Sequence, residues 1–207
     1  MPRRLTIVGL GGSLASVSRS RAALQLALEG AARAGADTTL LDLRELDLPM
    51  YPPDNDEPTP SAERLIEACY SADGMLWSSP MYNGSVSGSF KNAIDWLHML
   101  GSREPSFLHD KVIGLISAAG GTQGMQVVNT MEFSVRSLRA WAVPYVVPVA
   151  QATGVFADSG DVQNRAVEQQ LRLLGEEVVR VAERLARDPT VHRQLECDEA
   201  AERVARA

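Results

Sequence analysis

Five short apolar segments that alternate with stretches suited to helices constrain the fold of this chain more than any other feature of its 207 residues. Runs rich in Val, Ile and Leu that alternate with helices are typical of a parallel β-sheet, because each parallel connection needs a crossover. Right-handed crossovers then place helices on both faces of the sheet. The sequence therefore predicts an α/β fold whose five strands lie near residues 5–10, 38–43, 74–79, 112–117 and 144–149.

The segments between and after these strands carry helix signals. We expect helices over residues 19–34, 61–72, 123–141 and 161–186, and a further helix that ends near residue 100. Gly35 is suited to end the first helix. The last helix is the clearest, because apolar residues at alternating spacings of four and three form one face of it: Val167, Leu171, Leu174, Val178, Val181 and Leu185.

The charge balance and the cysteines narrow the possible environments and partners. A net charge of -6 and a pI of about 5.1 argue against a general nucleic-acid binder and against binding to an anionic membrane. No apolar stretch approaches the roughly 20 residues of a membrane span, and Cys69 and Cys197 have no CxxC spacing. We expect a cytoplasmic protein with one domain over residues 1–187 and a charged tail over residues 188–207.

The first strand runs into a loop of glycines and serines. Gly11 and Gly12 allow a tight turn at the end of the strand, before the helix expected near residue 19. The hydroxyls of Ser13, Ser18 and Ser20, with the unpaired amides at the start of that helix, could hold a phosphate. The alternative is a serine-rich turn with an ordinary N-cap residue.

A dinucleotide site of the Rossmann type is a competing interpretation of this loop. Gly9 and Gly11 follow the strand with GxG spacing, and Asp42 ends the next strand. However, Leu14 stands where the third glycine of that fingerprint belongs. A loop rich in hydroxyls also suits a terminal phosphate better than a pyrophosphate pressed against glycines, so we prefer a monophosphate.

Residues 80–96, which follow the third strand, form the most informative segment of the chain. Pro80 stiffens the turn, and Asn83 and Gly84 tolerate positive φ angles. The segment is longer and more polar than a chain reversal needs, although a Pro/Asn/Gly turn is the simpler reading. We expect it to present backbone amides, Asn83 and an aromatic edge to a planar heteroaromatic ligand.

A third loop of small residues, 117–122, follows the fourth strand. Its lack of large side chains would let a ligand approach closely, although a tight turn before the next helix is the simpler explanation. In a sheet with strand order 2-1-3-4-5, the loops after strands one, three and four meet at one edge. Ligands of open α/β sheets bind there, so the convergence of the three loops is stronger evidence for a ligand site than any one loop.

Two motifs give the chain its resemblance to a known family. Residues 80–96 match the pattern P-x-Y-N-G-S-x-x-G-x-x-K-N-A-I-D-W almost completely. Residues 12–20 are similar to the phosphate loop G-S-L-R-x-x-S-x-N. Both patterns are those of the NADPH-dependent FMN reductase family, which the chain resembles over about residues 4–186.

The phosphate loop departs from the family pattern at two positions. Ala15 stands in place of the family arginine, and Ser20 stands in place of asparagine. The missing arginine removes a charge-assisted contact to a phosphate or a cofactor. Arg19 or Arg21 is the available substitute.

The resemblance implies a flavodoxin-like fold, which is a three-layer αβα sandwich with strand order 2-1-3-4-5. It also implies FMN as cofactor and NADPH or NADH as the donor of a hydride to N5 of the flavin. Because the flavin carries this chemistry, no side chain is expected to be catalytic. The cofactor-binding residues that the resemblance implies are Ser13, Ser18, Ser20, Pro80, Met81, Tyr82, Asn83, Gly84, Ser85, Ser117, Gly120 and Gly121.

The resemblance leaves the final electron acceptor open. Residues 154–158 are similar to family members that supply reduced flavin to a partner flavin-dependent monooxygenase, so delivery to such a partner or to a small acceptor is the expected function. If FMN stays bound, reduction of quinones, azo dyes, nitro compounds or metal oxyanions is the alternative. A flavodoxin-like electron carrier is the alternative from another class, although the helix in residues 80–96 argues against it. Family members form dimers or tetramers, so we expect a homo-oligomer.

The histidines, Cys69 and the pair of Lys91 with Asp95 are explained by structural roles rather than by catalysis or metal binding. The histidines His98, His109 and His192 show no metal-ligand spacing, so no metal site is expected. Cys69 lies on an apolar helix and is expected in the core. Lys91 and Asp95 are one helical turn apart and predict an ion pair, and the resemblance implies subunit contacts for them.

Overall fold

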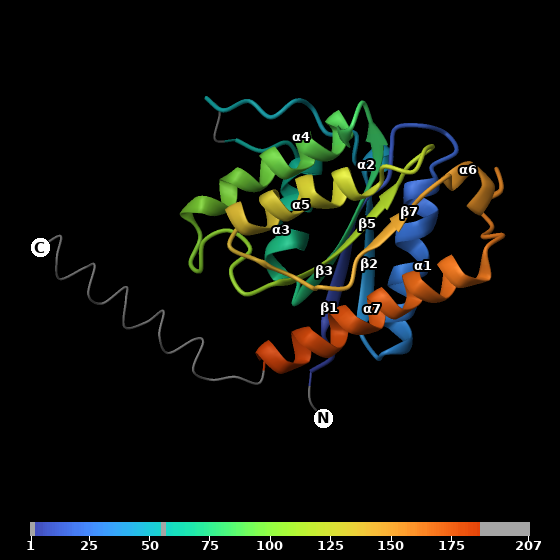
Figure 1. The fold of residues 1–207 in the computed structure, drawn as a ribbon. Helices are drawn as coiled ribbons and strands as arrows, with labels where there is room; N and C mark the ends of the chain where they lie inside the picture. Colours follow the sequence, from blue (N-terminus) through green and yellow to red (C-terminus); the bar gives the residue numbers. More distant parts are fainter. Residues whose placement is uncertain (1–2, 55–56, 187–207) are drawn as a thin grey trace, which may run out of the picture.

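One seven-stranded sheet runs through the computed structural model between two layers of helices (Figure 1). The structure describes residues 3–54 and 57–186, so the predicted tail lies outside the described part. The strands are β1 (Thr6–Gly11), β2 (Asp37–Asp42), β3 (Gly74–Tyr82), β4 (Ser85–Val86), β5 (Val112–Ala118), β6 (Trp141–Ala142) and β7 (Val147–Val149).

The strand order confirms the predicted 2-1-3-4-5 arrangement and the flavodoxin-like fold. β2 pairs with β1, β1 with β3, and β3 with β5, all in parallel. Only β7 lies within the predicted fifth strand, residues 144–149, and it pairs with the end of β5. The short strand β6 precedes that range and pairs with the start of β5. Pro144 lies between these two short strands and has no N–H to donate to the ladder.

The predicted helices are present near their expected positions, and the short helices α2 and α6 are additional to the prediction. They are α1 (Arg19–Arg33), α2 (Leu43–Leu46), α3 (Pro60–Ser71), α4 (Gly88–Trp96), the 3₁₀ helix η1 (Leu97–Ser102), α5 (Met125–Ser137), α6 (Ala152–Val155) and α7 (Arg165–Ala186). Gly35 follows the end of α1 at φ +94°, as the sequence predicts. None of the described helices is both long and apolar enough to span a membrane.

Three helix ends differ from the prediction, and one of them is the start of α7, which begins at Arg165 rather than near residue 161. The helix expected to end near residue 100 changes from α4 to η1 after Trp96. Helix α5 ends at Ser137, four residues before its predicted end at 141. It stops because Arg139 takes a positive φ of 62° and Trp141 joins the sheet, where its N–H donates to the carbonyl of Lys111.

The two helix layers bury separate apolar cores on the two faces of the sheet. Helices α1 and α7 lie on one face, and α3, α4 and α5 lie on the other (Figure 1). The second core contains Trp77, Phe90 and Trp96, all buried, and the Trp77 and Phe90 rings meet edge to face at 5.8 Å. Burial of these large side chains supplies much of the hydrophobic stabilisation.

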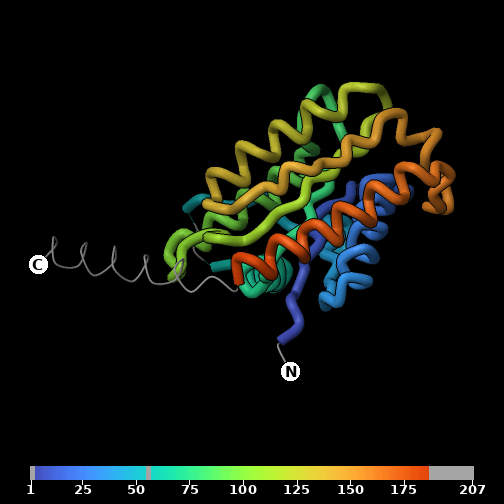
Figure 2. Tube along the Cα trace, turned by 60° about the horizontal axis from the view of Figure 1, so that its bottom comes forward, coloured from blue at the N-terminus to red at the C-terminus, as the bar shows by residue number. Residues whose placement is uncertain are grey.

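Helices α1 and α7 lie side by side at backbone contact distance (Figure 2). A Cβ atom added to Gly30 on α1 would lie 2.0 Å from the carbonyl oxygen of Arg172. A Cβ atom added to Gly175 on α7 would lie 1.9 Å from the carbonyl oxygen of Ala27. The two glycines therefore set how closely these helices approach.

We expect Gly175→Ala to destabilise the protein by roughly 1–3 kcal/mol, because the new methyl group overlaps the α1 backbone. This loss should outweigh the gain of up to about 1 kcal/mol that alanine brings to a helix. Urea denaturation measures the difference. Gly154→Ala on α6 is the control, because no described atom lies within 4 Å of its Cβ position. A Gly175→Ala protein as stable as the control would contradict the close approach.

The Cys69 thiol is predicted to stay unreactive in the folded protein. It is fully buried, and desolvation raises its pKa to about 12, while the nearby Lys111 charge acts in the opposite direction. In a Cys197→Ser variant, alkylation at pH 9 should therefore occur only as fast as the protein opens. Mass spectrometry across a urea series measures this, and rapid alkylation without urea would refute it.

Because the folded-state pKa is raised, Cys69 also contributes to the pH dependence of stability. The stabilisation of the folded state by the protonated thiol is fully present below about pH 9. It is lost as the pH rises towards 12, because the thiol of the unfolded chain loses its proton at a lower pH than the buried thiol does.

Candidate functional site

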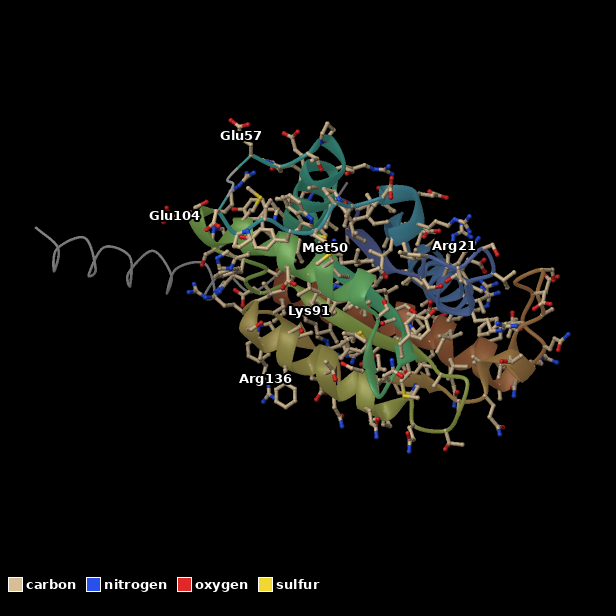
Figure 3. The ribbon with its side chains drawn as sticks, turned by 90° about the horizontal axis from the view of Figure 1, so that it is seen from above. Arg21, Met50, Glu57, Lys91, Glu104 and Arg136 are labelled. Atoms are coloured by element: carbon tan, nitrogen blue, oxygen red, sulfur yellow. The ribbon has the colours of Figure 1, made fainter. Side chains whose placement is uncertain are left out.

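The three predicted loops leave the same edge of the sheet. Gly11 on β1 lies opposite Ser78 on β3, and Pro80 on β3 lies opposite Ala118 on β5. The strands point in one direction, so the loops that follow them emerge together. Figure 3 shows the molecule from above, with Arg21 labelled on α1, the helix that follows the first loop, and Lys91 labelled on α4, the helix that follows the second loop.

The first loop gathers the three predicted serines at the start of α1. The Ser13 hydroxyl donates to Oγ of Ser18 at 3.1 Å, and Oγ of Ser18 lies 3.2 Å from Oγ of Ser20. Ser18 is also the N-cap, because its Oγ accepts a hydrogen bond from the Arg21 N–H. The phosphate-loop and N-cap interpretations of the sequence are therefore compatible. Ser13 and Ser20 are buried, so the hydroxyls are fixed by the fold.

An ion pair between the half-exposed Arg21 and the buried carboxylate of Asp42 lies behind this loop. The Arg21 Nε lies 2.5 Å from a carboxylate oxygen of Asp42, whose side chain is only 6% exposed. Asp42 also caps α2 by accepting the N–H of Arg44. Asp42 is the residue that a Rossmann site would use for a ribose, but here it has two partners within the fold. The flavodoxin-like strand order also argues against the dinucleotide alternative.

The second loop is a β-hairpin, which the sequence did not predict. Strand β3 continues past the expected end at Ser79 to Tyr82, and β4 returns antiparallel to it. Asn83 and Gly84 make the turn with positive φ angles of 50° and 83°. Two central residues with positive φ are the requirement of a type I′ turn, for which Asn-Gly is the preferred sequence.

The hairpin distributes its residues between the core and the surface. Pro80 is buried and Met81 is half-buried against the core, whereas Tyr82 is 53% exposed. Asn83 and Gly84 are exposed at the tip, and Ser85 is half-buried. The turn thus carries the polar atoms and the aromatic ring that the predicted ligand platform requires.

The third loop also reaches this edge, but Ser117 contributes no available hydroxyl. Its side chain is completely buried and donates to the carbonyl of Gly124 at 2.9 Å. Gly120 and Gly121 are exposed, with no described atom within 4 Å of their Cβ positions. The carbonyl of Gly121 accepts the Gln151 N–H, which attaches the loop to the segment before α6.

Two buried serines that the sequence analysis did not select hold the loops in place. The Ser78 hydroxyl donates to the carbonyl of Ser20 at 2.8 Å and so connects β3 with the start of α1. The Ser79 hydroxyl donates to the carbonyl of Pro80 and accepts the N–H of Ser87. Hydroxyl residues at the end of an otherwise apolar strand were the available signal, because buried hydroxyls need partners.

Residues of the K-N-A-I-D-W motif hold the segment that follows α2. The Asn92 side chain donates to the carbonyl of Pro49 and accepts the N–H of Tyr51, each at 2.9 Å. The Trp96 indole donates to the same carbonyl of Pro49 at 2.9 Å. The expected pair between Lys91 and Asp95 is present on the exposed side of α4. The motif thus has a structural role that spacing alone did not reveal.

Large apolar side chains are exposed on several segments of the molecule, including the loops at this edge. Leu14 is 62% exposed on the first loop, Tyr82 is 53% exposed on the hairpin, and Met125 is 45% exposed at the start of α5. Met50, beside the segment held by Asn92, is 79% exposed. Apolar side chains around polar loops are the composition expected of a site for a planar ring.

A cleft of about 570 Å³ begins beside the first loop and runs between α1 and the segment before α7. It is lined by residues from the first loop, including Ser16 and Ser18, and by residues 157–162. An ion pair of 2.9 Å between Arg19 and Asp158 joins the two sides. We call the first loop, residues 12–18 with Ser20 at the start of α1, the serine loop. Residues 154–158, which resemble members that supply reduced flavin, therefore end beside the serine loop.

The histidines do not form a metal site with other ligand side chains among the described residues. His98 lies near the rings of Tyr51 and Phe107, and His109 lies 3.4 Å from Asp110. His192 lies outside the described residues. Within residues 3–54 and 57–186, no group of three or more His, Cys, Asp or Glu side chains is placed to hold a metal ion.

We expect Asn92→Ala to destabilise the protein by about 1–3 kcal/mol, because it leaves the partly buried Tyr51 N–H without its acceptor and removes the donor to the carbonyl of Pro49. Limited proteolysis should also cut residues 47–54 faster in this variant. Asn129→Ala, an exposed change on α5, is the matched control. Equal urea midpoints and equal cleavage rates for the two variants would show that Asn92 does not hold this segment.

Comparison with known proteins identifies the family. The sequence profile of the NADPH-dependent FMN reductases matches residues 5–154. An NADPH-dependent FMN reductase ArsH from Rhizobium meliloti is 29% identical over 86% of this chain and 72% of its own length. An FMN-dependent NADPH-azoreductase from Staphylococcus aureus is 31% identical over 63% of this chain and 66% of its own length.

A solved structure supports the same fold. FerB, a flavoenzyme NAD(P)H:(acceptor) oxidoreductase from Paracoccus denitrificans, superposes with a TM-score of 0.71 and 21% identity, over 87% of this chain and 98% of that one. The family match covers most of the chain and includes all three loops. The chain therefore belongs to the NADPH-dependent FMN reductase family, and it is a flavin-dependent oxidoreductase that uses FMN and NADPH.

Proposed function

We propose that the serine loop at the start of α1 holds the phosphate of FMN. The observation that carries the proposal is the cluster of three serine hydroxyls at a helix N-terminus, in which Oγ of Ser18 lies 3.1 Å from Oγ of Ser13 and 3.2 Å from Oγ of Ser20. Hydroxyl groups and the positive end of the helix dipole are what a phosphate dianion requires. The residues present therefore fit this part of FMN, within a single domain over residues 1–187.

The isoalloxazine ring is assigned to the hairpin and the third loop. Tyr82 and Asn83 supply an aromatic face and polar atoms, and the exposed Gly120 and Gly121 leave room for a ring. Pro80, Met81, Gly84 and Ser85 shape the hairpin, and the buried Ser117 shapes the third loop through its bond to Gly124. These roles are supported by the common edge from which both loops emerge.

Bound FMN would supply N5 as the acceptor of a hydride from NADPH or NADH. The residues of this chain would then bind and orient FMN and the nicotinamide nucleotide, so no general acid or base is assigned. The nicotinamide and, afterwards, the electron acceptor would bind in turn at the same face of the flavin. Backbone amides at this edge would favour the negative charge of reduced flavin.

The reduced flavin is proposed to pass its electrons to a small acceptor or to a partner flavin-dependent monooxygenase. Delivery is supported by the position of residues 154–158, whose Asp158 contacts Arg19 at the serine loop. Retained FMN that reduces azo compounds or quinones is the second candidate. Relatives named FMN-dependent NADPH-azoreductase and probable NADPH:quinone oxidoreductase favour that candidate.

The protein is further proposed to be a cytoplasmic homodimer or homotetramer. The exposed Phe133 and Trp141, at 67% and 59%, are the kind of large apolar side chains that a second copy would cover. Light scattering of the purified protein tests the oligomeric state, and a monomer at micromolar concentration would contradict it.

NADPH oxidation separates the proposed enzyme from an electron carrier. Under anaerobic conditions, NADPH alone should bleach the absorbance of FMN added to the protein. Steady-state rates with FMN, a quinone and an azo dye should then rank the acceptors. Flavin that remains oxidised in the presence of NADPH would favour the electron carrier.

Ser13→Ala tests the phosphate site. We expect FMN affinity to fall by about 5- to 150-fold, which corresponds to about 1–3 kcal/mol for a buried hydrogen bond to a charged group. Quenching of FMN fluorescence measures the affinity. Ser137→Ala is the control, because that exposed hydroxyl donates only to the carbonyl of Ser134 at the end of α5. Unchanged FMN affinity in Ser13→Ala would refute the assignment.

A further inference from the structure

The serine loop lacks a positive charge of its own, and two arginines of α1 are near enough to supply one. Ala15 occupies the position of the family arginine, while Arg19 and Arg21 lie in the first turn of α1. That turn contains no acidic residue. Two cations at the positive end of a helix dipole are unfavourable unless an anion compensates them.

Arg21 is already committed to another partner. Its Nε lies 2.5 Å from the nearly buried carboxylate of Asp42, and its terminal nitrogen lies 3.9 Å from Glu45. Turning Arg21 towards a ligand would leave the nearly buried carboxylate of Asp42 with only the Arg44 N–H as partner and without its cation, which is unfavourable. Arg21 therefore serves the junction between α1 and α2.

Arg19 is held far less firmly. One terminal nitrogen contacts Asp158 at 2.9 Å, but the Asp158 side chain is 85% exposed. The Arg19 side chain is 26% exposed, and its Nε is buried without a hydrogen-bond partner among the described residues. An exposed ion pair is weak, whereas a buried donor without an acceptor is costly. An additional acceptor near Arg19 would remove that cost.

Arg19 borders the serine loop and shares a cleft with it. Arg19, Asp158, Ser16 and Ser18 line the same cleft of about 570 Å³. Arg19 also directly follows Ser18, whose hydroxyl lies in the middle of the serine cluster. A phosphate at this cluster and the carboxylate of Asp158 would therefore compete for one guanidinium.

We propose that Arg19 is the cation that binds the flavin phosphate in this chain, and that Asp158 is its counter-ion until the phosphate displaces it. This inference rests on the proposed FMN site. Binding of the phosphate would release Asp158 and thereby couple residues 157–162 to the presence of flavin. The same contact would link the phosphate to the segment that resembles members delivering reduced flavin.

The ratio of FMN affinity to riboflavin affinity isolates the phosphate contact. Fluorescence titrations of the full chain with each flavin give this ratio for the wild type and for the variants. In Arg19→Gln we expect the ratio to fall by about 10-fold or more, because a hydrogen bond to a charged group is lost. Arg19→Lys should restore part of it, because the charge remains while the planar donor group is lost.

Asp158→Asn should change the ratio in the opposite direction. Without a competing carboxylate, FMN affinity should rise by about 2- to 5-fold, whereas riboflavin affinity should stay the same. Arg33→Gln, at the other end of α1, is the matched charge control and should leave the ratio unchanged. Thermal melting of each variant shows that it is folded.

The outcomes separate this inference from the proposed function. If the wild type bleaches FMN with NADPH but Arg19→Gln keeps the wild-type ratio, the role of Arg19 is refuted and the FMN site stands. An equal loss of affinity for both flavins would also refute a phosphate contact. An unchanged FMN affinity in Asp158→Asn would refute the competition. A wild type that binds neither flavin would overturn the flavin site itself.

Discussion

The register of three parallel strands, β1, β3 and β5, sets the geometry on which the rest of the structure depends. Their hydrogen bonds place Gly11 opposite Ser78, and Pro80 opposite Ala118. Because the side chains of a strand alternate between faces, a shift of one residue would exchange the two apolar cores. The same register fixes the points from which the serine loop, the hairpin and the third loop, residues 117–122, emerge. The site is therefore a consequence of how the sheet is assembled.

Two arginines at the start of α1 connect the loop-bearing edge of the sheet to residues that are distant in the sequence. The first turn has two arginines, and each finds its carboxylate on another element. The pair of Arg21 with Asp42 is sheltered and secures α1 against the end of β2. The pair of Arg19 with Asp158 is open to solvent. Burial of the partner carboxylate thus gives two neighbouring arginines different functions, since the nearly buried Asp42 is costly to leave without its cation and the exposed Asp158 is not.

Pro80 shows why local patterns predicted the strands well but missed the hairpin. A proline after an apolar run usually ends a strand, because it cannot donate to a ladder. Here the pairing of β3 with β1 ends at Ser78, so Pro80 lies beyond that partner and continues β3 beside β5. Similarly, α5 ends early because Trp141 pairs with Val112. Both differences depend on which strands are neighbours, and periodicity does not contain that information.

The strand order was predicted from the family resemblance, because local patterns do not say which strands are neighbours. The sequence by itself determined the parallel α/β sheet, the serine loop and the turn chemistry of Asn83 and Gly84. Each of these depends on residues close together in the chain, such as an apolar run, an N-cap or an Asn-Gly pair. Only the tertiary structure decided that Asn92 holds Pro49, that Gly30 and Gly175 let two helices touch, and that Arg21 is committed while Arg19 is available. Those roles depend on partners that lie far apart in the sequence and meet only when the sheet and its helices pack.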